Sequence, residues 1–133
     1  RNFDKAKELA DHVFHHFGRR IHPLTWEQGN IKAALNKADV IVNATSIGMY
    51  PSVTGIPFPI TLIRPTHVVF DLVYNPYKTR LLAGAEKFGA RIISGLEMLV
   101  WQGAASFKLW TDQDAPVDVM KKVVLRALTE DEE

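Results

Sequence analysis

Polar side chains follow three apolar runs of this sequence, at the points where strands are expected to end. The runs continue into NATSIGM (residues 43–49), DLVYNP (71–76) and ISGLEM (93–98). Open α/β sheets bind ligands at the carboxyl ends of their strands. The amide and hydroxyl groups of the first segment could bind a ligand, and Gly48 would let its backbone come close. The segment could equally be a polar turn that satisfies its own backbone, and the residues alone leave both interpretations open.

A carboxylate interrupts the second run. Side chains alternate across a strand, so Val68, Phe70, Leu72 and Tyr74 are expected on one face and Asp71 on the other. An unpaired charge inside a strand costs several kcal/mol, so Asp71 should accept hydrogen bonds from neighbouring groups and act as structural support. Tyr74 would then present its hydroxyl at the edge where ligands bind.

The third run continues into a long apolar segment, GLEMLVWQGAASFKLW, that carries one side-chain amide, Gln102. A buried amide needs a hydrogen-bond partner, so the residues alone favour a core glutamine bonded to backbone. Gly103 beside it costs a helix about 1 kcal/mol relative to alanine. This cost predicts that another group approaches closely there.

Two cations, Arg1 and Lys5, lie where the first helix is expected to begin, with Asn2 as its cap. An anion at this place would be stabilised by free backbone N–H groups and by both cations. The alternative is an ordinary solvated basic pair, and position alone does not decide between them.

The sequence gives only weak evidence for other kinds of catalytic or metal site. Two of the imidazoles of His12, His15 and His16 could share a helix face, but without cysteine or a well-placed carboxylate they favour no metal site. We find no Ser/His/Asp set in recognisable context and no complete G-x-G-x-x-G loop.

The elements that would position these groups alternate between helix and strand, which predicts an α/β fold with a parallel sheet, right-handed crossovers and helices on both faces. A long irregular loop is expected over 50–66. Helices are expected from residue 2 to Gly18, over 31–37, 77–88 and 95–110, and from Pro116. Strands are expected near 20–23, within 38–46, over 68–73 and within 90–94.

Composition limits the classes of protein that fit. The 133 residues are 47% hydrophobic and 23% charged with a formal net charge of +1, which suits one soluble domain and neither nucleic acid nor an anionic membrane as partner. The absence of cysteine agrees with a reducing compartment, and no membrane span or signal peptide is evident, so a cytoplasmic protein is expected. Because the chain starts at Arg1 without methionine, we expect a fragment.

Together, ADVIVNATSIGM, VVFDLVYNP..T.LL and ISGLEMLVWQGAASFKLW resemble the carboxy-terminal, nucleotide-binding half of shikimate dehydrogenase, from Arg1 to about Val124 and in the family's order and spacing. The resemblance implies a Rossmann-like doubly wound parallel sheet that is incomplete, because the first strand and the glycine-rich loop are missing. Residues 1–133 would form a partial NADP-binding domain with a C-terminal helix from about 116. The upstream domain, which carries the family's catalytic lysine and aspartate, would be absent.

The family reduces 3-dehydroshikimate to shikimate with NADPH, in aromatic amino-acid biosynthesis. By resemblance, Arg1 and Lys5 would hold the adenosine 2′-phosphate and Met98 would lie near the nicotinamide. Tyr74 and Gln102 match residues that reach the substrate, which reverses the interpretation of Gln102 given above. The residues that the resemblance assigns to cofactor binding are Arg1, Asn2, Lys5, Asn43, Ala44, Thr45, Ser46, Leu72, Gly95 and Met98.

Departures and alternatives follow from the same comparison of motifs. Glu97 stands where many members have glycine, so it would either narrow the nicotinamide pocket or favour the helix N-terminus. A quinate or quinate/shikimate dehydrogenase, or a noncatalytic nucleotide-binding module, would fit the same half-fold. The isolated chain is expected to be inactive. Unpaired strand edges and an uncovered apolar face on the final helix would promote self-association, with a homodimer left open.

Overall fold

The computed structural model describes residues 2–130, which belong to two compact units, Arg1–Lys37 and Ala38–Glu133. The first unit contains two helices and the second contains the sheet and three further helices. None of the helices in residues 2–130 is both long and apolar enough to span a bilayer.

The helix α1 (Phe3–Phe17) has the start and the stop that its sequence predicts. Asn2 caps it, because its Oδ1 atom accepts a hydrogen bond of 3.1 Å from the backbone N–H of Lys5. Gly18 ends it in the left-handed conformation at φ 63°, and its N–H donates to the carbonyl of Phe14.

The rest of the first unit departs from the sequence prediction. The helix α2 spans Gln28–Leu35 and so begins and ends earlier than expected. The strand expected near 20–23 is wrong, because these residues form no regular structure and are mostly exposed. A strand is stable only where it pairs with a neighbour, and this segment pairs with no strand in residues 2–130.

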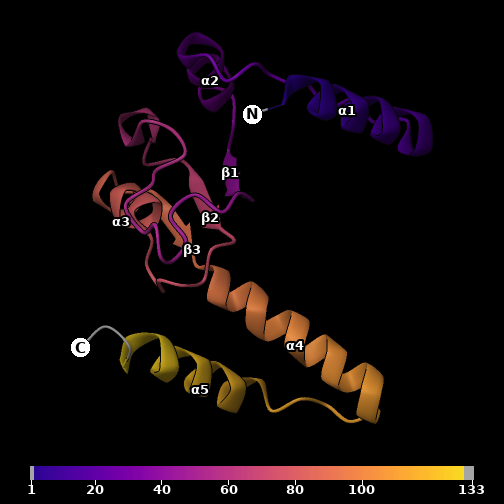
Figure 1. Ribbon diagram of the computed structural model, residues 1–133, viewed down its shortest axis with the longest axis vertical. Coiled ribbons are helices and arrows are strands. Elements are labelled where there is room, and N and C mark those ends of the chain that lie inside the picture. The colour runs from indigo at the N-terminus through magenta and orange to yellow at the C-terminus, as the bar shows by residue number, and fades with distance from the viewer. Residues whose placement is uncertain (1, 131–133) are drawn as a thin grey trace. The chain divides into compact units, whose positions relative to one another are not determined.

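The second unit is built on three parallel strands in the order β1-β2-β3 (Figure 1). Their bounds are Val40–Asn43 for β1, Val68–Asp71 for β2 and Arg91–Ile93 for β3. The register pairs Asn43 with Asp71 at the carboxyl ends of β1 and β2. The polar residues that the sequence placed at strand ends therefore lie side by side.

Two kinds of connection join the strands. A long irregular segment with one short 3-10 helix, η1 (Ile60–Leu62), leads from β1 to β2, so the strict alternation of strand and α-helix fails there. The helix α3 (Arg80–Lys87) leads from β2 to β3 and packs on both strands. After β3 come α4 (Gly95–Thr111) and α5 (Val117–Glu130), which pack on each other.

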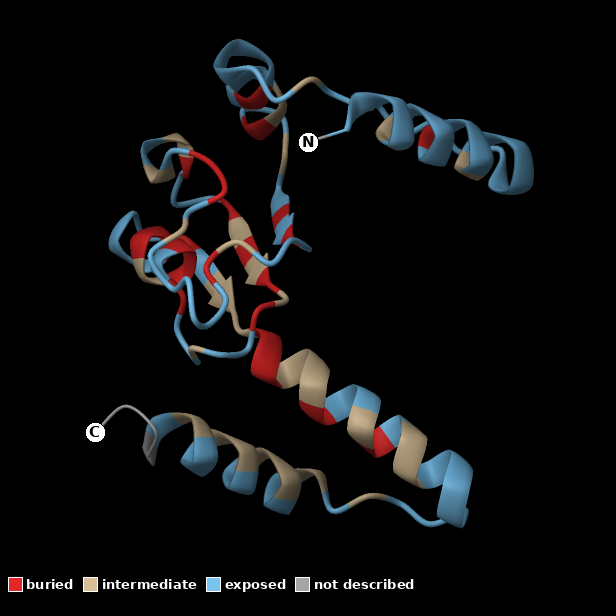
Figure 2. Cartoon of the chain, in the orientation of Figure 1, coloured by how far each residue is buried: buried red, intermediate tan, exposed pale blue. Residues whose placement is uncertain are grey.

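The strand β2 shows the alternation that its sequence predicts (Figure 2). Val69 and Asp71 are fully buried, whereas Val68 and Phe70 are half-buried. The buried face packs against α3, where Leu81 and Leu82 are 1% and 0% exposed. Each such leucine contributes about 2 kcal/mol by leaving water, which fixes α3 on the sheet.

The helix α5 buries more of its apolar face than expected. Its half-buried apolar residues are Val117, Met120, Val124, Leu125 and Leu128, while Val123 is exposed. This face lies along α4, so the expectation of an uncovered apolar face on the final helix is wrong for these residues, whereas Val119 and Val123 remain exposed. The close approach predicted at Gly103 is confirmed, because a Cβ atom there would lie 3.1 Å from Cε of Met120.

Candidate cofactor and substrate site

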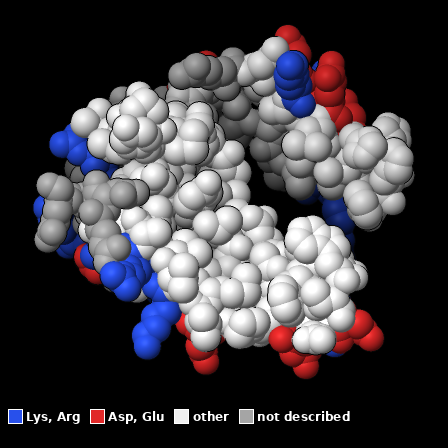
Figure 3. Space-filling model, turned by 60° about the horizontal axis from the view of Figure 1, so that its bottom comes forward, with Lys and Arg blue, Asp and Glu red and all other residues white. Residues whose placement is uncertain are grey.

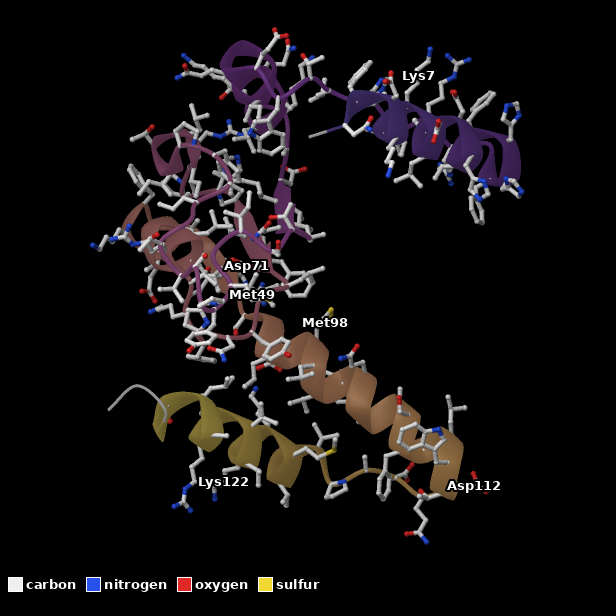
Figure 4. All side chains as sticks on the ribbon, in the orientation of Figure 1. Lys7, Met49, Asp71, Met98, Asp112 and Lys122 are labelled. Carbon is white, nitrogen blue, oxygen red and sulfur yellow. The ribbon has the colours of Figure 1, made fainter. Side chains whose placement is uncertain are left out.

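The carboxyl ends of β1 and β2 are joined by their side chains. The side-chain amide of Asn43 donates a hydrogen bond of 2.9 Å to Oδ1 of Asp71. Figure 4 shows Asp71 at this end of the sheet and Met98 on the first part of α4. The edge that the sequence predicted as a ligand site is therefore held by a buried polar pair.

Asp71 is completely buried and serves as an acceptor for three groups. Besides Asn43, the backbone N–H of Val73 donates to its Oδ1 at 3.1 Å and the hydroxyl of Thr79 donates to its Oδ2 at 2.6 Å. Such charge-assisted bonds offset the cost of burying a carboxylate. The prediction that Asp71 is structural support is confirmed.

Thr79 is the residue of this network that sequence reasoning missed. It is fully buried and caps α3, since its Oγ1 accepts a hydrogen bond of 3.2 Å from the N–H of Leu82. A threonine immediately before a helical apolar pattern is a recognised N-cap signal. Here the pattern begins with Leu81 and Leu82, so the sequence did contain the signal. Thr79 connects the start of α3 to the end of β2.

Asn43 has no side-chain capacity left for a ligand. Its amide also donates to the carbonyl of Ile47, and its Oδ1 accepts from the N–H and the hydroxyl of Thr45 at 3.1 and 2.7 Å. For this side chain the polar-turn interpretation is correct. Contacts from this segment to a ligand would come from its backbone or from the exposed residues Ala44, Thr45 and Ser46.

The first residue of α4 lies against the end of β2 with no room for a side chain. A Cβ atom on Gly95 would lie 2.5 Å from the carbonyl oxygen of Leu72. Ser94 strengthens this junction, because its hydroxyl donates to the carbonyl of Tyr77 at 3.1 Å and accepts from the N–H of Leu96. Leu72 and Gly95, both predicted for the cofactor, are thus brought together.

One face of α4 carries three of the predicted site residues. Gly95, Met98 and Gln102 are spaced by three and four residues, so they lie on the same side of the helix. Met98 is half-buried and Gln102 is exposed, and within residues 2–130 the Gln102 side chain makes no hydrogen bond. The interpretation of Gln102 as a core amide is therefore wrong.

Tyr74 is also available to a ligand. Its side chain is 41% exposed, three residues beyond the end of β2. Tyr50 joins the same edge, since its backbone N–H donates to the carbonyl of Asn75 at 3.0 Å. Within the described residues, no hydrogen bond joins the side chains of Tyr74 and Gln102.

Glu97 occupies the opposite side of α4 from Gly95 and Gln102. Its Oε1 accepts a hydrogen bond from Nζ of Lys121 on α5. This bond raises the pKa of Lys121 above its ordinary value. Glu97, which stands where the family resemblance predicts glycine, thus binds α5.

The predicted phosphate ligands lie in the first unit. Arg1 lies outside the described residues. Asn2 and Lys5 are exposed at the start of α1, where Asn2 acts as the cap. The strand ends described above belong to the second unit.

No group of three His, Asp or Glu side chains within residues 2–130 could hold a metal ion. The rings of His12 and His16 stack at 4.0 Å, and His16 bonds the carbonyl of His12. Figure 3 shows exposed charged side chains of both signs.

Comparison with known proteins identifies the relatives of this chain. Residues 95–125 match the model of the shikimate 5′-dehydrogenase C-terminal domain. The chain is 48% identical over 132 residues to the shikimate dehydrogenase (NADP(+)) of Dehalococcoides mccartyi strain CBDB1, which covers 99% of the chain and 46% of the relative. The corresponding protein of Moorella thermoacetica is 46% identical over 108 residues, 80% of the chain and 37% of the relative. The chain thus spans about half the length of these relatives or less.

Solved structures similar to this chain include shikimate dehydrogenases as well. Shikimate 5-dehydrogenase from Listeria monocytogenes, in complex with shikimate and NAD, superposes with a TM-score of 0.84 at 30% identity over 92% of the chain and 43% of that structure. The Thermus thermophilus enzyme in complex with NADP(H) and shikimate gives 0.78 at 34% over 96% and 44%. These relatives define a class, the nicotinamide-dependent dehydrogenases with a Rossmann-like fold. Within it, the chain is related to the shikimate dehydrogenases, so the predicted resemblance and fold class are confirmed.

Proposed function

We propose that this chain is the cofactor-binding part of an NADP-dependent shikimate dehydrogenase, which interconverts 3-dehydroshikimate and shikimate. The observation that carries the proposal is the contact of Gly95 with Leu72. At this junction a helix N-terminus meets the carboxyl end of a parallel strand, the place where open α/β sheets bind their ligands. The 48% identity to an NADP-dependent relative over nearly the whole chain supports the choice of cofactor.

The residues at this edge fit a nicotinamide ring. Leu72 and Met98 are half-buried and apolar, and Gly95 places no side chain at the helix start. When bound, the nicotinamide would supply the hydride, while the protein positions and shields it. The backbone of residues 43–46 would line the cofactor, and Arg1 and Lys5 would hold the 2′-phosphate at the start of α1 with Asn2 beside them.

The substrate would be reached by two exposed polar groups. The hydroxyl of Tyr74 and the amide of Gln102 are both free to bind hydroxyl or carboxylate groups. No residue of this chain is assigned to the acid/base step. We expect a cytoplasmic protein that acts on a small molecule and binds neither membrane nor nucleic acid, consistent with its net charge of +1.

A quinate dehydrogenase is the second candidate. The quinate dehydrogenase of Corynebacterium glutamicum, in complex with NAD, superposes with a TM-score of 0.82 at 30% identity, over 94% of the chain and 44% of that structure. That score is close to those of the shikimate dehydrogenases, so the fold does not separate the two substrates.

The test is an absorbance assay of the full-length natural protein with shikimate and quinate, each with NADP and NAD. We expect the highest kcat/KM for shikimate with NADP. A preference for quinate would select the second candidate. If the protein turns over neither substrate, titration with NADP shows whether it is a noncatalytic nucleotide-binding module.

A further inference from the structure

We propose that Lys121 is a positioning residue of the cofactor site and acts through Glu97. By neutralising this carboxylate, Lys121 keeps the first turn of α4 from discriminating between the positively charged oxidised nicotinamide and the neutral reduced one. The inference rests on the proposed function, because it requires the nicotinamide to bind beside Gly95 and Met98.

The ion pair joins two helices at a defined point. Lys121 lies on α5 and Glu97 in the first turn of α4, and their side chains are 45% and 39% exposed. Electrostatic interactions with Tyr77 and Asp118 also favour the charged form of Lys121. A second contact, Met120 against Gly103, keeps α5 in place along α4. The ammonium group is therefore held beside Glu97 by more than one interaction.

Glu97 lies in the same turn of α4 as the proposed nicotinamide contacts Gly95 and Met98, but on the side of the helix that faces α5, so its charge would act on the ring across the helix, over about 10 Å. The first turn is anchored to the end of β2 by the contact of Gly95 with Leu72, so the helix that carries this carboxylate is fixed relative to the proposed ring site. An unpaired negative charge there would attract the oxidised ring and leave the reduced ring almost unaffected. Pairing with Lys121 cancels most of that field.

The two members of the pair should therefore have opposite effects. Replacing Lys121 leaves Glu97 unpaired and should favour NADP+ over NADPH. Replacing Glu97 with glutamine leaves Lys121 unpaired and should favour NADPH over NADP+. Because both side chains are partly exposed and solvent screens their charges, each change in the ratio of the two dissociation constants should be only about threefold.

The experiment measures dissociation constants of NADP+ and NADPH by titration of the full-length natural protein. The variants are Lys121→Met, Glu97→Gln, the double variant and Lys121→Arg. The matched control is Lys122→Met, because Lys122 is exposed on α5 and points away from α4 (Figure 4). Circular dichroism checks that each variant retains its helices.

The expected result is a shift of the ratio in opposite directions for the two single variants, with wild-type ratios in the double variant, Lys121→Arg and Lys122→Met. High salt should reduce both shifts. Equal weakening of both cofactors in Lys121→Met would indicate a purely structural role and overturn the inference. Failure of the wild-type protein to bind either form would instead overturn the proposed function itself.

Discussion

The hydroxyl of Thr79 donates a 2.6 Å hydrogen bond to Oδ2 of Asp71, so the cap of α3 and the end of β2 share one buried carboxylate. Asp71→Ala removes this acceptor and leaves the donors of Asn43, Val73 and Thr79 unpaired in the interior. Because each buried unsatisfied group costs about 1 to 3 kcal/mol, we expect a loss of at least 3 kcal/mol in the free energy of unfolding. Urea denaturation measures it.

The control for this change is Asp39→Ala, at an exposed position just before β1. Its effect should stay within about 0.5 kcal/mol. Equal destabilisation by both substitutions would contradict the special role of Asp71.

Gly95→Ala tests the junction between β2 and α4. The added methyl group would lie 2.5 Å from the Leu72 carbonyl, which is backbone and cannot turn aside. We expect α4 to shift, so that both stability and NADP affinity fall. Gly29→Ala is the matched control, because a Cβ there meets nothing within 4 Å. A Gly95→Ala variant that binds NADP normally would show that the junction is not part of the cofactor site.

The Arg1→Ala/Lys5→Ala variant tests cofactor choice. Loss of charge-assisted bonds to a 2′-phosphate should cost about 1.5 to 3 kcal/mol for each cation. The Michaelis constant for NADPH should therefore rise far more than that for NADH in steady-state kinetics. Equal rises for both cofactors would remove the phosphate assignment.

The variants Tyr74→Phe and Gln102→Ala test the substrate contacts. Both residues are assigned to substrate alone, so shikimate turnover should fall while NADP affinity stays nearly unchanged. Steady-state kinetics and a thermal-shift titration with NADP measure the two effects. Lost NADP affinity in either variant would argue against the assignment.

The ion pair between Lys121 and Glu97 predicts an alkaline weakness. The hydrogen bond to Glu97 raises the pKa of Lys121 above its ordinary value of 10.5. The pair's stabilisation is therefore complete below this value and is lost as the pH rises through the higher pKa of the folded state. The stability difference between wild type and Lys121→Met should shrink over that range in denaturation experiments. A constant difference would exclude the pair as its source.

Local rules predicted much of the fold. The cap at Asn2, the stop at Gly18 and the alternation along β2 each depend on a few adjacent residues, and each is confirmed. Segment 20–23 was predicted wrongly because a strand depends on a distant partner, which its own residues do not encode.

The candidate site shows the same division. The burial of Asp71 followed from its place within an apolar run, but its partners Asn43 and Thr79 come from other elements. The exposure of Gln102 could not be read from its apolar neighbours, because it depends on which side of α4 meets α5. Pairing of Glu97 with Lys121 likewise joins residues that are 24 positions apart.

The network around Asp71 also has an order of assembly. Its bond to Thr79 closes a loop of 8 residues, whereas its bond to Asn43 closes one of 28. Closure entropy grows as (3/2)RT ln n, so the ratio 28/8 makes the longer closure about 1.1 kcal/mol more costly. By chain entropy alone, the bond from Asp71 to Thr79 therefore costs less free energy to form than the bond to Asn43. A fluctuation that detached the long loop would release Asn43 and could leave the strand, its carboxylate and the helix cap joined.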